Sequence, residues 1–426
     1  MTDPNDVINV LGSKLLIDKN AIVVDLKRSQ GSWVVDERTG RQYLDCFSQF
    51  ASQALGWNHP KMTSQKERLA DAAVNKVANS DMYTTQFADF VKKFSEFTQD
   101  FPHHFYICGG ALAVENALKA AFDWKAKKMG ISEDRAYNSL QIIYLQEAFH
   151  GRSGYTMSMT NNGDPRNPKT YGFPKFNWKK IHNPKVWHNP GGVDEIKARN
   201  SETIAINEAR KALERGNVAA IILEPIQGEG GDNHFRYEFF SALRRLADEK
   251  ECLLIFDEVQ TGMGMTGKAW AYQHFDIKPD IMCFGKKVQV CGICGGERLD
   301  EVKDNVFTEA SRINSTWGGN IVDMVRSTMQ MEIIQDDDLI SNAKEVGEYF
   351  LSGLKQFHGK VNNIRGRGLM LSFDLDSTDN RNSFLTRLEE NVLALPCGKK
   401  SVRFRPHLTF SKMDVDEAVR FIEKAL

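Results

Sequence analysis

The 426-residue chain has no excess of charge of either sign: 55 Lys and Arg stand against 56 Asp and Glu, which leaves a net charge of −1. A near-neutral chain of this kind offers no broad basic surface, so we expect neither nucleic acid nor an anionic membrane as a partner. No apolar run approaches the roughly 20 residues that a membrane-spanning helix needs. The start, MTDPNDVINV, also lacks the basic and apolar segments of a signal peptide.

Cysteine is scarce, and the odd number of seven does not suit a framework of disulfides. Cys291 and Cys294 form a CxxC, but no second pair or histidine cluster completes a zinc site, so we interpret them as packing in a glycine-rich loop. His103, His104 and His150 lack the spacing of metal ligands such as HExxH. We therefore expect no metal, and a reducing compartment, the cytoplasm, as the location.

A possible dinucleotide motif is also weak. Gly262, Gly264 and Gly267 match GxGxxG, but residues 257–261 separate these glycines from the preceding strand-like run. The dinucleotide fingerprint needs its glycines directly between strand and helix, so we do not predict such a site.

What the sequence does contain is an alternation of short apolar runs and helical stretches from about residue 140 to residue 284. The runs are QIIYL, AAIILEP, LLIFDE and DIMCFG, with a helical pattern near residues 237–250. This pattern is typical of βαβ units around a parallel sheet, in which ligands bind at the carboxyl ends of the strands. Phe149, Glu224, Asp257 and Lys286 each follow such a run, so we predict that they gather at one edge of the sheet.

Asp257 and Lys286 are the pair of groups that pyridoxal phosphate requires. A carboxylate beside the ring nitrogen keeps the pyridinium protonated, and a lysine amine holds the aldehyde as a Schiff base. Taken singly, each residue also has an ordinary explanation, because Asp257 and Glu258 could cap a turn and Lys286 could be a solvated lysine. The helical pattern after Gly109, with free N–H groups at its start, adds a candidate phosphate site.

The motifs GGALAVENALK, FHGRSGYT, EPIQGEGG, FDEVQTGMGMTG, PDIMCFGKK, NSTWGGN and VRFRPHLT resemble, in order, those of the class III (omega) aminotransferases. GKKVQVCG, NSTWGGN and VRFRP resemble the L-lysine 6-aminotransferase branch more than the ornithine or 4-aminobutyrate branches. The resemblance implies an α/β protein of fold type I, with a mainly parallel central sheet, helices on both faces and a smaller α+β domain. It also implies a large cofactor-binding domain over residues 61–320, and a small domain formed by residues 1–60 and 321–426.

The resemblance implies a role for each matching residue around the cofactor. Lys286 forms the Schiff base, Asp257 pairs with the ring nitrogen, and Phe149 stacks on the ring. Thr316 reaches the phosphate of the partner subunit's cofactor, which implies a homodimer with shared active sites. The implied cofactor-binding set is Gly110, Ala111, Phe149, His150, Glu224, Asp257, Gln260, Lys286 and Thr316, in which Gly110 and Ala111 bind the phosphate and Gln260 binds the phenolic oxygen.

For the substrates, the resemblance implies that Arg403 binds the carboxylate next to the reacting carbon and that Arg152 binds the distal one. Glu229 neutralises Arg403 when lysine places an apolar chain there, because an unpaired buried charge is costly. Gln260 belongs to the substrate-binding set as well. The implied reaction converts L-lysine and 2-oxoglutarate to 2-aminoadipate 6-semialdehyde and L-glutamate.

Some positions depart from the wider family pattern, and some alternatives stay open. Leu112, Met265 and His407 replace the usual acid, arginine and proline, and Arg405 is an extra cation that we expect to face away from Arg403. The nearest alternative is an omega-aminotransferase acting on ornithine or 4-aminobutyrate. A racemase or decarboxylase of the same fold is a further alternative, and a non-catalytic role gives no reason for Asp257 and Lys286 to occur together.

Overall fold

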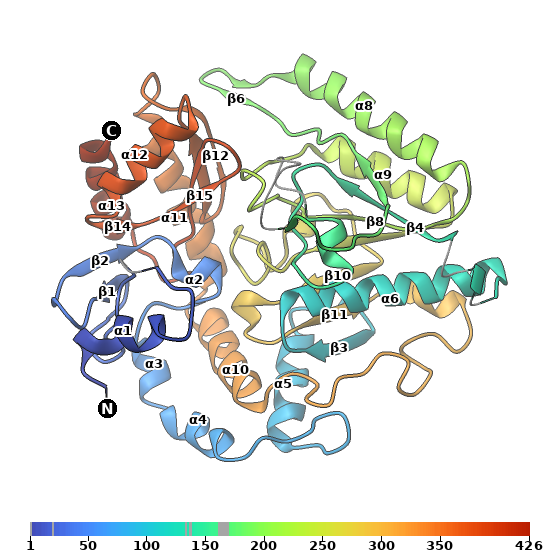
Figure 1. The fold of residues 1–426 in the computed structure, drawn as a ribbon, viewed down its shortest axis with the longest axis horizontal. Coiled ribbons are helices and arrows are strands. Elements are labelled where there is room, and N and C mark those ends of the chain that lie inside the picture. The colour runs from blue at the N-terminus through green and yellow to red at the C-terminus, as the bar shows by residue number, and fades with distance from the viewer. Residues whose placement is uncertain (1, 19–20, 133, 136–138, 161–169) are drawn as a thin grey trace.

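A computed structural model describes the chain except for residues 1, 19–20, 133, 136–138 and 161–169 (Figure 1). Its centre is a seven-stranded sheet with the strand order β3-β11-β10-β9-β8-β4-β5. The strands are β3 (His103–Ile107), β4 (Gln141–Leu145), β5 (Lys179–Ile181), β8 (Val218–Leu223), β9 (Leu253–Asp257), β10 (Ile281–Phe284) and β11 (Cys291–Gly295). Strands β10, β9, β8, β4 and β5 run parallel, as the apolar runs predicted.

Strand β11 differs from the prediction, because it runs antiparallel to both β10 and β3. Cys291 and Cys294 were predicted to lie in a glycine-rich loop, but they lie on this strand. The strand was not predicted because it contains glycines. Close packing requires one of them, since a Cβ on Gly292 would come within 2.1 Å of the Phe105 backbone oxygen on β3. A strand rich in glycine carries little of the β-branched signal by which strands are predicted.

Helices cover both faces of the sheet, and consecutive residues of one strand show which helix lies on which face. Ile142 belongs to the apolar core formed with helix α6 (Gly110–Met129). Its neighbour Ile143 belongs to the core formed with helix α9 (Tyr237–Glu249). Because side chains alternate along a strand, the two helices must lie on opposite faces. Helix α8 (Glu195–Leu213) contacts α9.

Two smaller sheets lie near the two chain ends (Figure 1). One contains β1 (Trp33–Val35), β2 (Gln42–Asp45) and β14 (Val392–Leu393), and another has the order β12 (Asn362–Arg367), β13 (Met370–Asp374), β16 (Ser401–Phe404), β15 (Leu395–Cys397). Strands β1 and β2 pair antiparallel. Since β14 pairs with β2, the first and the last hundred residues share a sheet. The limits of the two predicted domains stay a prediction.

The other helices are α1 (Val7–Gly12), α2 (Ser48–Ala51), α3 (Pro60–Thr63), α4 (Lys66–Ala73), α5 (Thr85–Ser95), α10 (Ile321–Asp336), α11 (Leu339–Lys355), α12 (Thr378–Leu388) and α13 (Lys412–Ala425). A two-stranded ribbon joins β6 (His188–Asn189) to β7 (Gly192–Val193). The sequence from 161 to 192 is rich in Asn, Pro and Gly, which is typical of an irregular segment. Residues 161–169 lie outside the described part, and β5 and β6 fall within the rest. Among the described residues, no helix combines the length and the apolar content that crossing a bilayer requires.

Segment α2 is not an ordinary helix. Its four residues have positive φ angles: 40° at Ser48, 54° at Gln49, 58° at Phe50 and 66° at Ala51. This conformation is left-handed, and none of the four residues is a glycine. We refer to residues 48–51 as the left-handed turn.

Candidate active site

A cavity of about 860 Å³ opens at the carboxyl ends of β4, β8, β9 and β10. This volume lies within the range of small-molecule and cofactor sites. Every predicted site residue except Thr316 lines it: Gly110, Ala111, Phe149, His150, Arg152, Glu224, Glu229, Asp257, Gln260, Lys286 and Arg403. The sequence reasoning missed seven further lining residues: Gln49, Phe50, Ser52, Gly151, Val259, Gln289 and Cys291.

Asp257 is the last residue of β9, and its carboxylate is held from two sides. Oδ2 lies 2.8 Å from Nδ1 of His150, and Oδ1 accepts a hydrogen bond from the Val259 backbone N–H at 3.1 Å. Asp257 and His150 are both buried. His150 therefore fixes the orientation of the carboxylate, while its own Nε2 is buried without a partner among the described residues.

Glu224 follows β8 and holds the turn that carries Phe149. Its carboxylate accepts hydrogen bonds from the backbone N–H groups of Phe149 at 3.0 Å and Gly228 at 3.1 Å. Burial raises the pKa of Glu224 to about 7. By holding the Phe149 backbone, Glu224 thus positions the Phe149 ring.

Lys286 lies two residues beyond the end of β10, with a positive φ of 49°. Its Nζ donates a hydrogen bond to the Phe50 backbone oxygen at 3.1 Å. Burial, and then the nearby charge of Arg403, lower the pKa of Lys286 to about 8. Since a lowered pKa enlarges the fraction of neutral amine at pH 7, Lys286 is suited to act as a nucleophile.

Lys287, the neighbouring lysine, does not line the cavity. It is 2% exposed, and its Nζ donates to the Ala51 backbone oxygen at 2.7 Å. Gln289 completes the series, since its Nε2 donates to the Ser52 backbone oxygen at 2.7 Å. The carbonyl groups of Phe50 and Ala51, in the left-handed turn, and of Ser52, directly after it, therefore accept hydrogen bonds from the segment that carries Lys286.

The start of helix α6 provides a place for a phosphate group. Gly110 and Ala111, its first residues, line the cavity, where the free N–H groups of a helix start can bind an anion. Gly151 packs against them with a φ of 116°, and a Cβ at this position would lie 2.5 Å from the Ala111 Cβ. Only glycine allows this close approach.

Arg403 and Glu229 form an ion pair of 2.5 Å on the wall of the cavity. The Arg403 side chain is 3% exposed and that of Glu229 is 32% exposed. Nε and Nη1 of Arg403 are buried without hydrogen-bond partners among the described residues. An arginine with free donors is suited to bind a carboxylate. Arg152 is exposed, and its guanidinium lies 5.9 Å from the centre of the Phe149 ring.

The expectation that Arg405 faces away from Arg403 was wrong. Side chains two residues apart in a strand share a side, and the charges of both arginines lower the pKa of Lys286. Arg405 is buried, forms an ion pair with Asp232, and reaches Gln260.

Thr316 is exposed and lies outside the cavity of its own chain. Its backbone oxygen accepts a hydrogen bond from Ser80 Oγ at 3.1 Å. Next to it, Trp317 stacks with the Lys76 ammonium group, which lies 3.8 Å from the ring centre. A contribution of Thr316 to a site in another subunit stays a prediction.

Taken together, the residues around the cavity fit pyridoxal phosphate. Asp257 offers a buried carboxylate with a fixed orientation, and Lys286 offers an amine with a lowered pKa. The start of α6 offers N–H groups, and Phe149 offers a ring. These are the four functions that the cofactor requires of a protein: an acid for the ring nitrogen, an anchor for the aldehyde, a phosphate cradle and a stacking surface.

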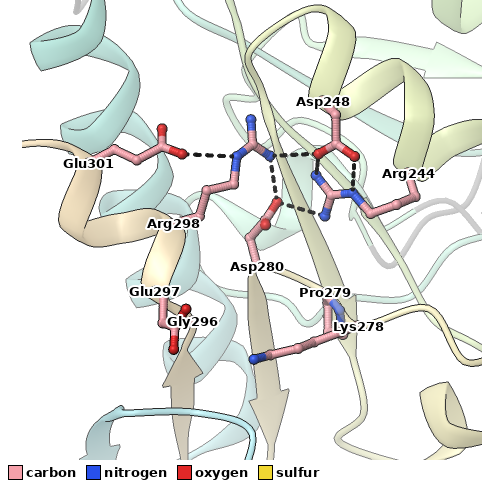
Figure 2. Close-up of a pocket in the computed structure, with 9 residues that line it drawn as sticks. All are labelled: Arg244, Asp248, Lys278, Pro279, Asp280, Gly296, Glu297, Arg298 and Glu301. Atoms are coloured by element: carbon pink, nitrogen blue, oxygen red, sulfur yellow. Dashed lines mark hydrogen bonds and ion pairs between the residues drawn. The ribbon is translucent and has the colours of Figure 1, made fainter.

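A second hollow lies at the opposite, amino-terminal ends of β9 and β10 (Figure 2). Several of its charged groups pair with one another: Asp280 pairs with Arg244 at 2.9 Å and with Arg298 at 3.1 Å. Asp280 also accepts a hydrogen bond from the Leu254 backbone N–H at 2.7 Å. Asp280 therefore ties the two strands together.

Comparison with known proteins agrees with the geometry of the cavity. Residues 17–426 match the family model of aminotransferase class-III. The chain is 48% identical to the L-lysine-epsilon aminotransferase of Mycobacterium bovis, over 100% of this chain and 96% of the relative. It is 47% identical to the L-lysine-epsilon aminotransferase of Streptomyces clavuligerus, over 99% of this chain and 94% of the relative. Among solved structures, the lysine aminotransferase of M. tuberculosis in the internal aldimine form superposes with a TM-score of 0.94 at 47% identity, covering 100% of this chain and 99% of the other. The chain therefore belongs to the class-III aminotransferase family.

Proposed function

We propose that the protein transfers the ε-amino group of L-lysine to 2-oxoglutarate, which yields 2-aminoadipate 6-semialdehyde and L-glutamate. The observation that carries the proposal is the pair of Arg403 with Glu229, in which a buried cation has both a carboxylate partner and two unused donors. The names of the similar enzymes support lysine as the amino donor.

Pyridoxal phosphate, when bound, supplies the carbonyl group that takes up nitrogen and the ring that accepts electrons. Nζ of Lys286 would hold the cofactor, and the same amine, when free, would move a proton to and from the substrate carbon. Asp257, oriented by His150, keeps a proton on the ring nitrogen. Phe149 covers one ring face, and Gly110 and Ala111 hold the phosphate by their N–H groups. Gln260 would donate to the phenolic oxygen, and Glu224 holds the turn that carries Phe149.

The two substrates place different groups beside Arg403. The reacting carbon of 2-oxoglutarate carries a carboxylate, which Arg403 can bind with its free Nε and Nη1. The ε end of lysine carries only methylene groups, so Arg403 then needs Glu229. The Glu229 backbone is fixed, since its oxygen accepts a hydrogen bond from the Gly398 N–H at 2.8 Å, while its side chain is partly exposed. A side-chain rotation of Glu229 can therefore switch the site between substrates, while Arg152 binds the distal carboxylate of each.

Glu229→Ala is expected to slow the lysine half-reaction more than the glutamate half-reaction. Only the former needs Arg403 neutralised, and loss of a charge-assisted hydrogen bond of about 1.5–3 kcal/mol corresponds to roughly one to two decades in rate. Single-turnover kinetics of each half-reaction measure the difference. Glu229→Gln is the matched control, because it keeps the size of the side chain and removes its charge. Equal losses in both halves would mean that Glu229 only supports its loop.

Transfer of nitrogen from the ε position is tested directly with L-lysine that carries heavy nitrogen at either the ε or the α position. We expect label in glutamate only from the ε position, because the α-amino and α-carboxyl groups lie at the distal end near Arg152. Mass spectrometry of glutamate reports the transfer. Label from the α position would overturn the proposed reaction, and faster turnover of ornithine or 4-aminobutyrate in parallel assays would favour those substrates.

We also propose a homodimer with shared active sites. Thr316 and Trp317 lie beside the segment around Ser80, and the side chains there include exposed apolar groups. The exposed fractions are 79% for Val74, 66% for Met82, 79% for Tyr83 and 39% for Trp317. An apolar surface of this kind suits a subunit contact.

In sedimentation experiments the wild-type protein is expected to behave as a dimer. Tyr83→Lys is expected to dissociate it and to weaken cofactor binding, because Thr316 then no longer reaches the partner's phosphate. Lys66→Glu, on the exposed surface of α4, serves as a control for a change in charge. A monomeric wild-type protein with full activity would contradict the shared site.

We propose the cytoplasm as the location of the protein. All seven cysteines are free, and Cys108 is exposed. Free thiols of this kind suit a reducing compartment.

A further inference from the structure

Arg405 is a fully buried cation that the proposed reaction does not use. Its side chain is 1% exposed, as is that of its ion-pair partner Asp232. Nη1 donates a hydrogen bond to the Phe404 backbone oxygen at 2.9 Å. Burial of both charges is costly unless the remaining donors of the guanidinium are also used.

Asp232 is itself held in place by a second arginine. Nε of Arg365 donates a hydrogen bond to the Asp232 backbone oxygen at 2.8 Å, and Arg365 pairs with Asp374 at 2.9 Å. Asp232 and Arg405 therefore form a fixed support behind the cavity, between the loop after β8 and strand β13.

The other side of the Arg405 guanidinium faces Gln260, which lines the cavity. Nε and Nη2 of Arg405 lie 3.4 Å and 3.3 Å from Oε1 of Gln260, so that this oxygen accepts from both donors. Gly228 leaves the necessary space, because a Cβ at that position would lie 2.0 Å from the same oxygen. Because the guanidinium has only donors, it selects the oxygen end of the amide for the side of Arg405.

We propose that Arg405, held by Asp232, is a positioning residue that orients the side-chain amide of Gln260 so that its NH2 group is the donor available in the cavity. The amide is planar, and its oxygen and nitrogen lie on opposite sides, so an oxygen bound to Arg405 leaves the nitrogen for the cavity. The inference rests on the proposed cofactor, whose phenolic oxygen is the acceptor that requires such a donor.

The expected signature is spectroscopic and needs no substrate. A donor to the phenolic oxygen stabilises the negative charge on that oxygen. The stabilisation is stronger when the Lys286 nitrogen that holds the cofactor has lost its proton. The donor therefore lowers the pKa of this nitrogen. Loss of the donor is expected to raise the pH midpoint of the cofactor's visible absorbance by about one unit, the equivalent of one hydrogen bond. The charged groups around Lys286 are Asp257, Arg403, Arg405 and Glu229, and the test must leave their charges unchanged.

Arg405→Lys meets that condition, because it keeps the positive charge but cannot hold Asp232 and both contacts to Gln260 at once. The pH midpoint is measured for the holoenzyme of the wild type, Arg405→Lys, Gln260→Ala and the double variant. We expect each single change to raise the midpoint by about one unit, and the double variant to match Gln260→Ala alone.

Two outcomes would overturn the inference. In the first, Gln260→Ala raises the midpoint while Arg405→Lys leaves it unchanged. In the second, Arg405→Lys raises the midpoint as much in the Gln260→Ala background as in the wild type, which would mean that it acts by another route. If the lysine assignment failed in the labelling experiment, these midpoints would be unaffected, so the two failures are distinguishable.

Discussion

Lys286→Ala is expected to abolish the visible absorbance of lysine-bound cofactor and to lower turnover by at least about 10²–10⁴-fold, the usual contribution of a positioned acid–base group. The variant loses both the anchor for the aldehyde and the amine that moves the proton. Burial and the charge of Arg403 lower the pKa of this amine to about 8, and the neighbouring Lys287 does not line the cavity, so it cannot replace Lys286 in either role. Absorbance spectra and steady-state rates of the purified variant measure both effects.

Lys287→Met is the matched control for this result. The side chain is buried and hydrogen-bonded to the Ala51 oxygen, so its replacement is expected to lower thermal stability while the cofactor stays bound to lysine. Reduction of the wild type with borohydride, followed by peptide mapping, identifies the modified residue. A pyridoxyl group on Lys287 would show that the assignment of Lys286 is wrong.

Asp257→Asn is expected to lower turnover by roughly 10²–10³-fold, the range found when one fixed electrostatic group is removed from an active site. The amide keeps the size of the side chain and an acceptor oxygen for His150, so the loss arises from the missing charge beside the ring nitrogen. Without that charge the ring nitrogen is not kept protonated, and the ring accepts electrons less readily. Turnover with lysine and 2-oxoglutarate, together with the thermal stability of the variant, separates chemistry from folding.

Glu258→Gln provides the comparison for Asp257→Asn. Glu258 is also buried, but its carboxylate accepts hydrogen bonds from the Tyr272 N–H at 2.8 Å and the Ala271 N–H at 3.0 Å, and it does not line the cavity. Its replacement is expected to affect stability more than turnover. If the two variants lost activity equally, a direct role of Asp257 at the ring would be excluded.

The sequence was most informative where strands are buried on both faces. The apolar runs LLIFD and IMCF predicted central strands. Asp257 is the last residue of the first strand, and Lys286 follows the second. The rule that parallel strands present their carboxyl ends at one edge then brought distant residues together correctly. Glu224 and Phe149 were found in the same way, since each follows a strand.

The features that the sequence did not predict are those that depend on tertiary contacts. The left-handed turn contains no glycine, so nothing in FSQFAS signals positive φ angles. Gln289 and Cys291 line the cavity only because the chain turns back after Lys286 into antiparallel β11. The direction of Arg405 was predicted wrongly for a different reason, because side chains two residues apart share a side, but its contact with the distant Asp232 is evident only in the folded chain.

The left-handed turn also bears on how the enzyme matures after synthesis. A left-handed backbone costs about 1–2 kcal/mol per residue, so residues 48–51 cannot hold this shape alone in a nascent chain. Two donors that stabilise it, Lys286 and Lys287, lie more than half the chain away, and contacts of such long range form late in folding. The left-handed turn can therefore adopt its final conformation, and complete the wall of the cavity, only after the segment that carries Lys286 has folded. A fragment that ends before Lys286 would leave the turn without these donors and would be exposed to proteolysis there.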